Sequence, residues 1–494
     1  MVSSASHPLA IRQLDWKLST TEVFSYFSYS PWAILLDSAN APHQDARYDI
    51  ICAAPVASLV TTGDESCFTR YHCPLNSQNT FSADMPSSAL LELTPVDQVT
   101  STDDPFTLLN QYLNELYPIK QYSPLPFNAG AVGSFSYDLG RRIEAIPAIA
   151  KRDIDLPEMA LGFYDWALIF DNQQQSWSIV HYQGDAALDH VINRIQHKFL
   201  NCVKDSSTAP FKLTSPWQCQ TKKDDYSASF NKIHGYLHSG DCYQINLTQR
   251  FSASYQGDEW QAYLTLRDSN KAPFSAFFKL DKATILSISP ERFIQLTDVQ
   301  SGSQIQTKPI KGTLPRSSDP TLDALAATTL AGSAKDRAEN LMIVDLLRND
   351  IGKVATAGSV RVPHLFEIES FPAVHHLVST VTATLSPQYS ASDLLRAAFP
   401  GGSITGAPKI RAMEIIEELE PSRRSLYCGA IGYLSQDGKM DTNITIRTLV
   451  AQNSQLYCWA GGGIVADSEV EAEYQESFDK VSRILPALTP TQEG

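Results

Sequence analysis

The sequence predicts an α+β fold, and three observations lead to that class. Roughly the first 200 residues alternate short β-type runs with turn-rich stretches, and strong helical periodicity begins only after about residue 330. Strands and helices mix without the regular βαβ alternation that a doubly wound parallel sheet requires. No repeat with a period of about 20 to 50 residues is visible, which argues against a solenoid or a propeller.

Size and charge limit the classes of partner. The chain has 494 residues, of which 43% are hydrophobic and 19% charged, so a mainly disordered or coiled-coil protein is excluded. Lysine and arginine number 39 against 54 aspartates and glutamates, which gives a net charge of -15. Because bulk repulsion disfavours polyanions, we expect no nucleic acid and no membrane as partner. An anionic substrate must therefore be bound by a local site.

The sequence gives no sign of export or membrane insertion. No run of 18 apolar residues occurs, and the N-terminus lacks a basic segment followed by an apolar one. The eight cysteines are scattered, with no CxxC pair and no zinc-module spacing, so reduced thiols are expected. These features predict a cytoplasmic protein.

The N-terminal part is expected to be mostly sheet. Its clearest β-type runs are 32–36, 129–135, 166–170 and 177–181. A polar segment with two prolines, 204–223, is the best candidate for a boundary. We therefore expect an N-terminal region over 10–205 and a C-terminal region over 220–490.

The C-terminal part carries stronger signals. Three β-type runs follow one another across short turns and predict an antiparallel meander: 283–289, 293–297 and 303–310. Apolar residues at helical spacing predict three helices: 334–347, 408–419 and 468–485. The chain lacks GxGxxG after a strand, GxxxxGK[ST], GxSxG and HExxH, so its chemistry must come from carboxylates, a lysine and backbone amides.

The last predicted helix is the first candidate site. One of its faces carries four charged residues: Glu469, Glu473, Glu476 and Lys480. This face is either a solvated helix side with a Glu476–Lys480 ion pair or a source of oxygen ligands for a hard cation such as Mg²⁺. Glu339, in the helix predicted over 334–347, is a candidate for a further carboxylate ligand.

Two glycine-rich segments are the second candidate. Residues 400–408 read PGGSITGAP and run into a helix, and residues 460–464 read AGGGI and run toward the acidic helix. Such segments are either tight turns or anion sites, because backbone N–H groups without side chains beside them bind carboxylate or phosphate.

A lysine between a proline and a glycine is the third candidate. Lys311 lies in PIKGT, residues 309–313, and is either a surface residue or a nucleophile whose pKa is lowered by burial or neighbouring cations. Glu291, in SPERF, is either paired with Arg292 at the surface or a general acid.

Together these segments resemble the chorismate-utilising enzymes, the family that includes anthranilate synthase component I and isochorismate synthase. The resemblance covers essentially the whole chain and rests on ten blocks in one order: SGDCYQINLTQR (239–250), SPERF (289–293), PIKGT (309–313), KDRAENLMIVDLLRNDIG (335–352), FPAVHHLVS (371–379), FPGGSITGAPKIRAMEII (399–416), GAIGYLS (429–435), ITIRT (444–448), AGGGIVADS (460–468) and EAEYQESFDK (471–480). It implies a large two-part body in which antiparallel β-sheets pack face to face with helices outside.

Two positions indicate the branch of the family. The segment of anthranilate synthases that corresponds to PIKGT of this chain resembles PIAGT. A lysine at the third position is typical of the branch that makes 4-amino-4-deoxychorismate. Isochorismate and salicylate synthases carry a water-activating lysine where this chain has Gln244, so attack by water is disfavoured. The resemblance therefore implies chorismate and ammonia as substrates, with ammonia supplied from glutamine by a separate amidotransferase subunit.

The resemblance also implies roles for individual residues. Lys311 would attack the substrate, Glu291 would protonate the leaving hydroxyl, and His376 would lie beside the ring in a catalytic or a positioning role, whereas His375 would be structural. Mg²⁺ would be held by Glu339 and Glu476, with Glu473 acting through water. The substrate-binding residues would be Arg447, Tyr427, Thr405, Gly406, Ala407, Gly462, Gly463 and Lys480.

Family members also hold a tryptophan in the N-terminal half. The matching residues here are Ser38, Arg47, Tyr48, Pro273, Phe274 and Ser275. Two alternatives remain open at this point: anthranilate synthase component I, and a tryptophan-binding regulatory protein without turnover. The joint presence of Glu291, Lys311, Glu339 and Glu476 argues against the second.

Overall fold

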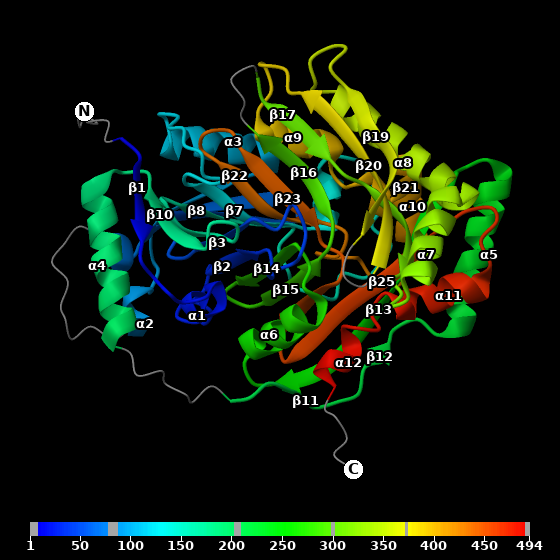
Figure 1. Cartoon of the computed structure of the whole chain (residues 1–494), viewed down its shortest axis with the longest axis horizontal. Helices are drawn as coiled ribbons and strands as arrows, with labels where there is room; N and C mark the ends of the chain where they lie inside the picture. The colour runs from blue at the N-terminus through cyan, green and yellow to red at the C-terminus, as the bar shows by residue number, and fades with distance from the viewer. Residues whose placement is uncertain (1–7, 78–86, 202–208, 298–301, 371–373, 490–494) are drawn as a thin grey trace.

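The computed structural model describes residues 8–77, 87–201, 209–297, 302–370 and 374–489. These residues form two large antiparallel sheets with helices around them, and this observation confirms the predicted α+β class (Figure 1). The predicted block FPAVHHLVS lies partly outside the described residues, since its first three residues are 371–373.

The first sheet has 13 strands within the described residues. In order they are β1 (Ala10–Leu14), β10 (Ser176–His181), β9 (Trp166–Asp171), β3 (Tyr48–Cys52), β2 (Ile34–Asp37), β14 (Phe274–Lys279), β15 (Thr284–Ser289), β24 (Thr448–Gln452), β25 (Gln455–Ile464), β13 (Gln244–Gln256) and β11 (Lys212–Leu213), with β12 (Gln218–Cys219) and β21 (Gly406–Ala407) also paired to β13.

The second sheet has 12 strands within the same residues. In order they are β18 (Ile310–Pro315), β20 (Val374–Thr384), β17 (Gln304–Thr307), β16 (Arg292–Thr297), β23 (Met440–Ile444), β22 (Ala430–Ser435), β7 (Gly130–Phe135), β8 (Met159–Tyr164), β4 (Ala57–Thr62), β5 (Glu65–His72) and β6 (Thr94–Ser101), with β19 (Arg361–Ser370) paired to β20.

The α-helices of the described chain lie around these sheets. They are α1 (Thr20–Phe24), α2 (Ser87–Leu90), α3 (Pro105–Leu116), α4 (Asp185–Asn201), α5 (Lys223–Ser239), α6 (Glu259–Asn270), α7 (Pro320–Gly332), α8 (Ala334–Gly352), α9 (Ala391–Ala398), α10 (Lys409–Leu419), α11 (Val470–Asp479) and α12 (Leu485–Leu488). Within the described residues, none of them combines the length and the apolar character needed to cross a bilayer.

Both sheets contain strands from both parts of the chain. In the first sheet β2 pairs with β14, and in the second β7 pairs with β22. The largest apolar core cluster includes Ile285 of the first sheet and Ile294 of the second, which are fully buried. The sheets therefore pack against each other over one core that both parts build. The boundary predicted between 205 and 220 stays a prediction.

The strands predicted in the N-terminal part are confirmed within two residues at each end, as β2, β7, β9 and β10. The helix predicted over 334–347 is longer and ends at Gly352, and the helix predicted over 408–419 begins at Lys409. The helix predicted over 468–485 is wrong in length, because α11 ends at Asp479. Beyond it the amides of Val481 and Ile484 bond three residues back, to Phe478 and Val481, as in tighter turns.

The predicted meander over 283–310 is also wrong. β16 and β17 pair, but β15 lies in the first sheet and β16 in the second. The chain therefore passes between the sheets at Pro290 and Glu291. It passes back between β23 and β24, through 445–447. The two crossovers are hydrogen-bonded to each other, since Ile444 N donates to Glu291 O at 3.0 Å and Ile288 N donates to Arg447 O at 3.0 Å.

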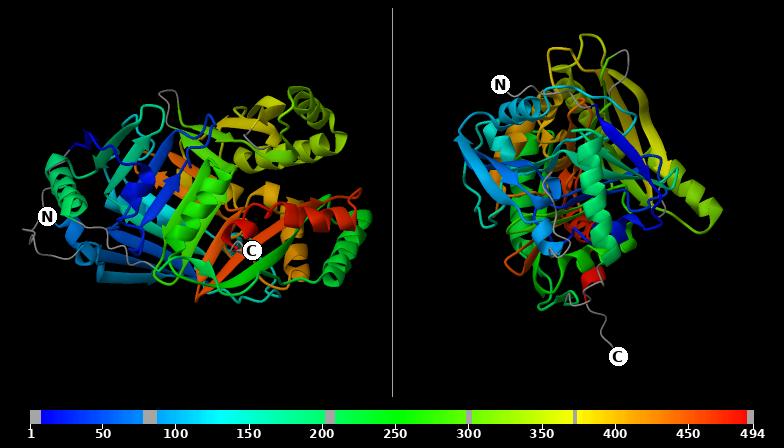
Figure 2. Two further views of the ribbon diagram at one scale, coloured as in Figure 1. Left: turned by 60° about the horizontal axis from the view of Figure 1, so that its bottom comes forward. Right: turned by 90° about the vertical axis from the view of Figure 1, so that its left-hand side faces the viewer.

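Figure 2 shows what this crossing does to the arrangement of the C-terminal part. In its left view, the yellow-green segment that contains α8 and β20 lies across from the red α11. The first segment packs on the second sheet, since α8 contacts β18 and β20, whereas α11 packs on β25 of the first sheet. In the C-terminal part of the chain, a segment that packs on the second sheet therefore faces a helix that packs on the first.

Candidate active site

Glu291 lies on the first crossover and is buried. Its side chain is only 6% exposed, and the Ser403 hydroxyl lies 3.5 Å from its Oε1. Burial raises the pKa of Glu291 to about 7, against the lowering effect of Lys311. The expected surface pair with Arg292 does not form, because Arg292 binds Asp441 and Asp45 instead. Glu291 is thus a carboxyl group that keeps its proton near neutral pH.

Lys311 lies in an irregularity of β18. The pairing of β18 with β20 shifts between Ile310 and Thr313, and Lys311 and Gly312 occupy the shift. Burial lowers the pKa of Lys311, and the charge of Lys480 lowers it further, while Glu339, Glu291 and Glu476 act in the opposite direction. Lys311 forms no ion pair within the described residues. Its amine is therefore placed among the charged residues that the sequence singled out.

The two histidines of β20 differ in surroundings. His376 is 4% exposed, and its Nδ1 lies 2.8 Å from the Thr313 hydroxyl. Burial and then the charge of Arg447 lower the pKa of His376 to about 4, so it is neutral near pH 7 and cannot act there as a cationic acid. His375 contacts Asp323 and Ser370 on other elements, which agrees with a structural role.

The acidic face of α11 turns toward β25. Glu473 is 3% exposed, its Oε1 accepts a hydrogen bond of 2.6 Å from Ser468, and its Oε2 is buried without a hydrogen-bond partner in the structure. A Cβ atom built on Gly462 would lie 2.8 Å from Glu473 Oε2 and 3.3 Å from Glu476 Oε1. The two carboxylates therefore converge on one position beside a strand that has no side chain there.

The donor set fits a hard cation, and Mg²⁺ stays a prediction. One or two carboxylates plus substrate oxygens and water are its usual ligands, and the buried Oε2 of Glu473 has no hydrogen-bond partner in the structure. Burial raises the pKa of Glu339, on α8, and the charge of Glu473 raises that pKa as well. Across the described ranges, no three histidine, cysteine or carboxylate side chains lie close enough to hold a metal by themselves.

The two predicted anion segments flank β13, one on each edge of the strand. Gly406 and Ala407 form β21 and pair with β13 at Ile245 and Gln244, while Gly462 and Gly463 lie on the opposite edge of β13, in β25. Thr405 is fully buried, and its hydroxyl donates to Gly401 O at 3.1 Å. The amine of Lys480 lies 2.7 Å from both Glu476 Oε1 and Gly461 O.

Arg447 lies on the second crossover with φ of 50°, a left-handed conformation that is uncommon for a side chain of this size. Burial lowers its pKa, and the structure gives its guanidinium neither a hydrogen bond nor an ion pair among the described residues. Tyr427, which is 5% exposed, stacks on Trp459 with ring centroids 6.0 Å apart. Arg447 is half-buried, and a cation of this kind without a counterion is suited to bind a carboxylate.

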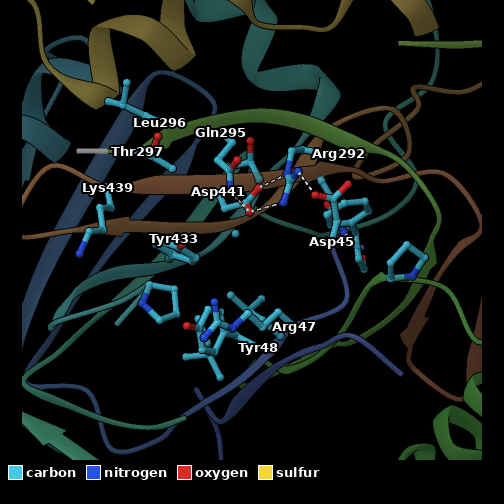
Figure 3. A pocket seen from close by; sticks show the side chains of 18 of the residues that line it. Asp45, Arg47, Tyr48, Arg292, Gln295, Leu296, Thr297, Tyr433, Lys439 and Asp441 are labelled. Carbon is cyan, nitrogen blue, oxygen red and sulfur yellow. Dashed lines mark hydrogen bonds and ion pairs between the residues drawn. The ribbon is translucent and has the colours of Figure 1, made fainter. Parts of the chain in front are cut away.

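A separate pocket of about 490 Å³ lies between the sheets (Figure 3). Five of the six residues predicted for tryptophan line it: Arg47, Tyr48, Pro273, Phe274 and Ser275. Ser38 does not line it, and its hydroxyl donates to Asp49 at 2.5 Å. Arg292, whose bonds to Asp441 and Asp45 are drawn in Figure 3, forms part of the wall.

The sequence analysis missed two residues beside these groups. Ser403 approaches Glu291 and could have been found, since it lies inside the glycine-rich segment. Lys335 lies one helical turn before Glu339 on α8, and its amine is 3.7 Å from Glu473 Oε1, so it bridges α8 and α11. Spacing to Glu339 was the available signal for Lys335, but contact with α11 could not be read from it.

Fold and site define an α+β enzyme class in which cationic and carboxylate groups from two crossed sheets surround a site for an anionic substrate. The family described as chorismate binding enzyme matches residues 34–486. The chain belongs to this family.

Comparison with known proteins gives relatives and a related structure. The chain is 54% identical over 482 residues to aminodeoxychorismate synthase component 1 of Escherichia coli (strain K12), covering 97% of this chain and 98% of that protein. It is 36% identical over 383 residues to anthranilate synthase component 1 of Geobacillus stearothermophilus, covering 74% and 75%. The crystal structure of anthranilate synthase component I from Streptococcus pneumoniae TIGR4 superposes with a TM-score of 0.72 at 30% identity, over 89% and 92%.

The raised pKa of Glu291 predicts a pH-dependent stability. The folded protein holds this proton more tightly than the unfolded chain, so the stabilisation is complete below pH 4.5 and is lost as pH rises through about 7. At 1.36 kcal/mol per pKa unit, the loss is about 3 kcal/mol. Glu291→Gln, which mimics the protonated form, should therefore gain that much stability relative to wild type between pH 4.5 and 8. Urea unfolding across this range measures it, and parallel pH profiles for the two proteins would contradict the assigned pKa.

Proposed function

We propose that this chain converts chorismate and ammonia to 4-amino-4-deoxychorismate, as the names of its 54%-identical relatives suggest. The observation that carries the proposal is Lys311. The less similar relatives include anthranilate synthases, and the sequence pattern of that branch has alanine at this position. A lysine whose pKa is lowered by burial, beside a carboxyl group that stays protonated near pH 7, provides a nucleophile and an acid together.

Chorismate has two carboxylates, and we assign one to each end of the site. Arg447 and Tyr427 would bind the enolpyruvyl carboxylate, because the guanidinium lacks a counterion of its own. Backbone amides near Gly406–Ala407 and Gly462–Gly463 and the amine of Lys480 would lie at the ring carboxylate. His376 would position the ring as a neutral hydrogen-bonding group.

The reaction would proceed in two displacements. The neutral amine of Lys311 attacks C2 of the ring, the two ring double bonds shift from C1=C2 and C5=C6 to C1=C6 and C4=C5, and the C4 hydroxyl leaves as water with the proton of Glu291. The attached amine loses its extra proton to solvent or to the Glu291 carboxylate. Ammonia then attacks C4, both double bonds shift back, and the C2–N bond to Lys311 breaks as the lysine nitrogen takes up a proton, which balances the proton that the added ammonia gives up. Two easier steps thus replace one hard displacement.

Glu339 and Glu476, with Glu473 through water, would hold Mg²⁺ in this proposal. When bound, the ion would neutralise the ring carboxylate of the substrate. The support is the convergence of Glu473 and Glu476 at Gly462 and the unpartnered buried oxygen of Glu473.

Ammonia would come from a second protein. The relatives' name, component 1, indicates a partner component, and we propose a glutamine amidotransferase of the aminodeoxychorismate branch in that role. We also propose that the chain acts in the cytoplasm, since its seven described cysteines form no disulfide, as is usual in a reducing compartment.

We further propose that the pocket of Figure 3 binds L-tryptophan. Its wall combines the rings of Tyr48, Phe274 and Tyr433 with acidic and amide groups, a lining suited to an aromatic amino acid. Neither Ser38 nor Asp49, to which it donates, lines the pocket, so contact of Ser38 with tryptophan stays a prediction. A non-catalytic tryptophan-binding protein, the other hypothesis, would not need the charged groups gathered around Lys311.

The role of Lys311 can be tested by product analysis. Wild type with chorismate, Mg²⁺ and an ammonium salt should form aminodeoxychorismate, which needs a lyase before p-aminobenzoate appears, whereas anthranilate would appear directly. Lys311→Ala should lose this product at least 100-fold, with traces of anthranilate allowed. Lys311→Arg keeps the charge and should be equally inactive, because arginine does not become a neutral nucleophile. Undiminished aminodeoxychorismate formation by either variant would rule out covalent catalysis by Lys311.

The carboxylate helices predict metal dependence. EDTA should abolish turnover, and Glu339→Gln or Glu476→Gln should do the same without unfolding, because each removes an anionic ligand. Glu471→Gln is the matched control, since Glu471 lies on the same helix but pairs with Lys223 at the surface. Full activity in metal-free buffer would show that the site needs no cation.

Tryptophan binding predicts a ligand-dependent melting temperature. A ligand at 100 times its Kd stabilises a protein by about 2.7 kcal/mol, so saturating L-tryptophan should raise the melting temperature of wild type. Phe274→Ala, which removes one ring from the wall, should weaken the shift. If tryptophan leaves unfolding unchanged and none is released from the denatured protein, the pocket has another role.

A further inference from the structure

A buried arginine outside the groups described so far binds to the backbone of the first glycine segment and of β13, the strand between the two glycine segments. Arg424 follows α10 and is 1% exposed. Its Nη1 donates to Ile404 O at 2.9 Å, and its Nη2 donates to Asn246 O at 2.7 Å. The first carbonyl lies just before β21, and the second lies in β13. One guanidinium therefore joins two segments that are distant in sequence.

Glu420 fixes the orientation of this guanidinium. Arg424 donates to both its carboxylate oxygens, with Nε–Oε2 at 2.9 Å and Nη2–Oε1 at 2.7 Å. Glu420 Oε1 also accepts from the amide and hydroxyl of Thr248, at 3.1 and 2.8 Å. The ring of Tyr137 lies 4.9 Å from the guanidinium carbon. Four of the five N–H donors of the planar guanidinium are thus used, and no other side chain has that geometry.

The segment that Arg424 joins to β13 carries one set of the proposed substrate amides, and β25, which carries the other set, pairs with the opposite edge of β13. β21 pairs with β13 at only two positions, Gln244 with Ala407 and Ile245 with Gly406. Beyond them the segment is held by Asn246, which donates from its amide to Thr405 O and from its side chain to Ser403 O. Asn246 also pairs with Gly463 of β25. A shift of the Asn246 or Ile404 carbonyl would therefore move both glycine segments relative to each other.

We propose that Arg424 is a positioning residue for chorismate binding: its two backbone hydrogen bonds set the separation of the glycine segments 402–407 and 461–463. It touches no substrate atom and acts through Ile404 and Asn246. The inference rests on the proposed function, since it takes a dicarboxylate substrate of the chorismate type as the ligand of these segments.

The test compares two conservative variants of the same ion pair. Arg424→Lys keeps a cation beside Glu420 but cannot reach both carbonyls with the same geometry, so chorismate should bind at least tenfold more weakly by calorimetric titration. Glu420→Gln keeps the arginine and its carbonyl bonds, so it should lose stability but bind chorismate within about threefold of wild type. A purely structural role predicts that affinity stays unchanged in both variants, or falls in proportion to the loss of stability.

Arg194→Lys is the matched control. Arg194 is 5% exposed and donates to the carbonyls of Pro74 and Leu75, far from the glycine segments in the fold. It should be destabilised without a change in chorismate affinity. If Arg424→Lys does not fold, Arg424→Gln takes its place, because its shorter side chain cannot donate to both carbonyls, and it should also bind chorismate at least tenfold more weakly.

Two outcomes overturn the inference. These are a folded Arg424→Lys that binds chorismate within twofold of wild type, and an unchanged Kd in Arg424→Gln where it is the only folded variant of Arg424. The proposed function is judged separately by the product that wild type forms from chorismate and ammonium. Failure of that reaction, with chorismate still bound, would leave the affinity comparison valid.

Discussion

Close approach of backbone to backbone at β13 is the constraint on which the site depends. A Cβ on Gly406, where φ is 145°, would lie 2.1 Å from Gln244 O, and one on Gly461 would lie 2.2 Å from Leu247 O. No side chain fits at these points, so β21 and β25 lie directly against β13. The same absence of side chains lets Glu473 and Glu476 reach the strand at Gly462. Glycine thus determines where the acidic helix and the anion segments meet.

Charge is then arranged locally against the overall balance of -15. Lys311, Lys480 and Arg447 enter the site from three different segments of the chain. The negative charges of Glu291, Glu339 and Glu476 balance the positive charge of Lys311. Burial moves the pKa of Lys311 down and that of Glu291 up, so that both move toward their neutral forms. A neutral amine beside a neutral acid is the pairing that displacement of a hydroxyl requires. The surplus of acidic residues elsewhere does not prevent this pairing.

Sequence reasoning succeeded where the signal is local. The helices that became α8 and α10 and the glycine segments could be found from periodicity and composition, because those signals lie within a few turns of chain. It failed at the meander, since the turn at Pro290 and Glu291 is as short as a hairpin but changes sheets. Nothing local distinguishes these two uses of a turn. The backbone hydrogen bonds between the crossovers of Glu291 and Arg447 therefore became visible only in the folded chain.

The crossover of Glu291 also connects the active site to the pocket of Figure 3. Successive residues of an extended strand point to opposite sides, so Glu291 turns toward Lys311 while Arg292 turns toward Asp441 and Asp45 at the pocket wall. The second crossover also begins beside the pocket, because Asn443, in β23, lines the pocket and Arg447 follows four residues later. Each of the two segments that enter the active site is thus held on its other side by side chains of the pocket. The geometry of Glu291 and Arg447 therefore depends on the packing of that pocket as well as on the glycine segments of β13.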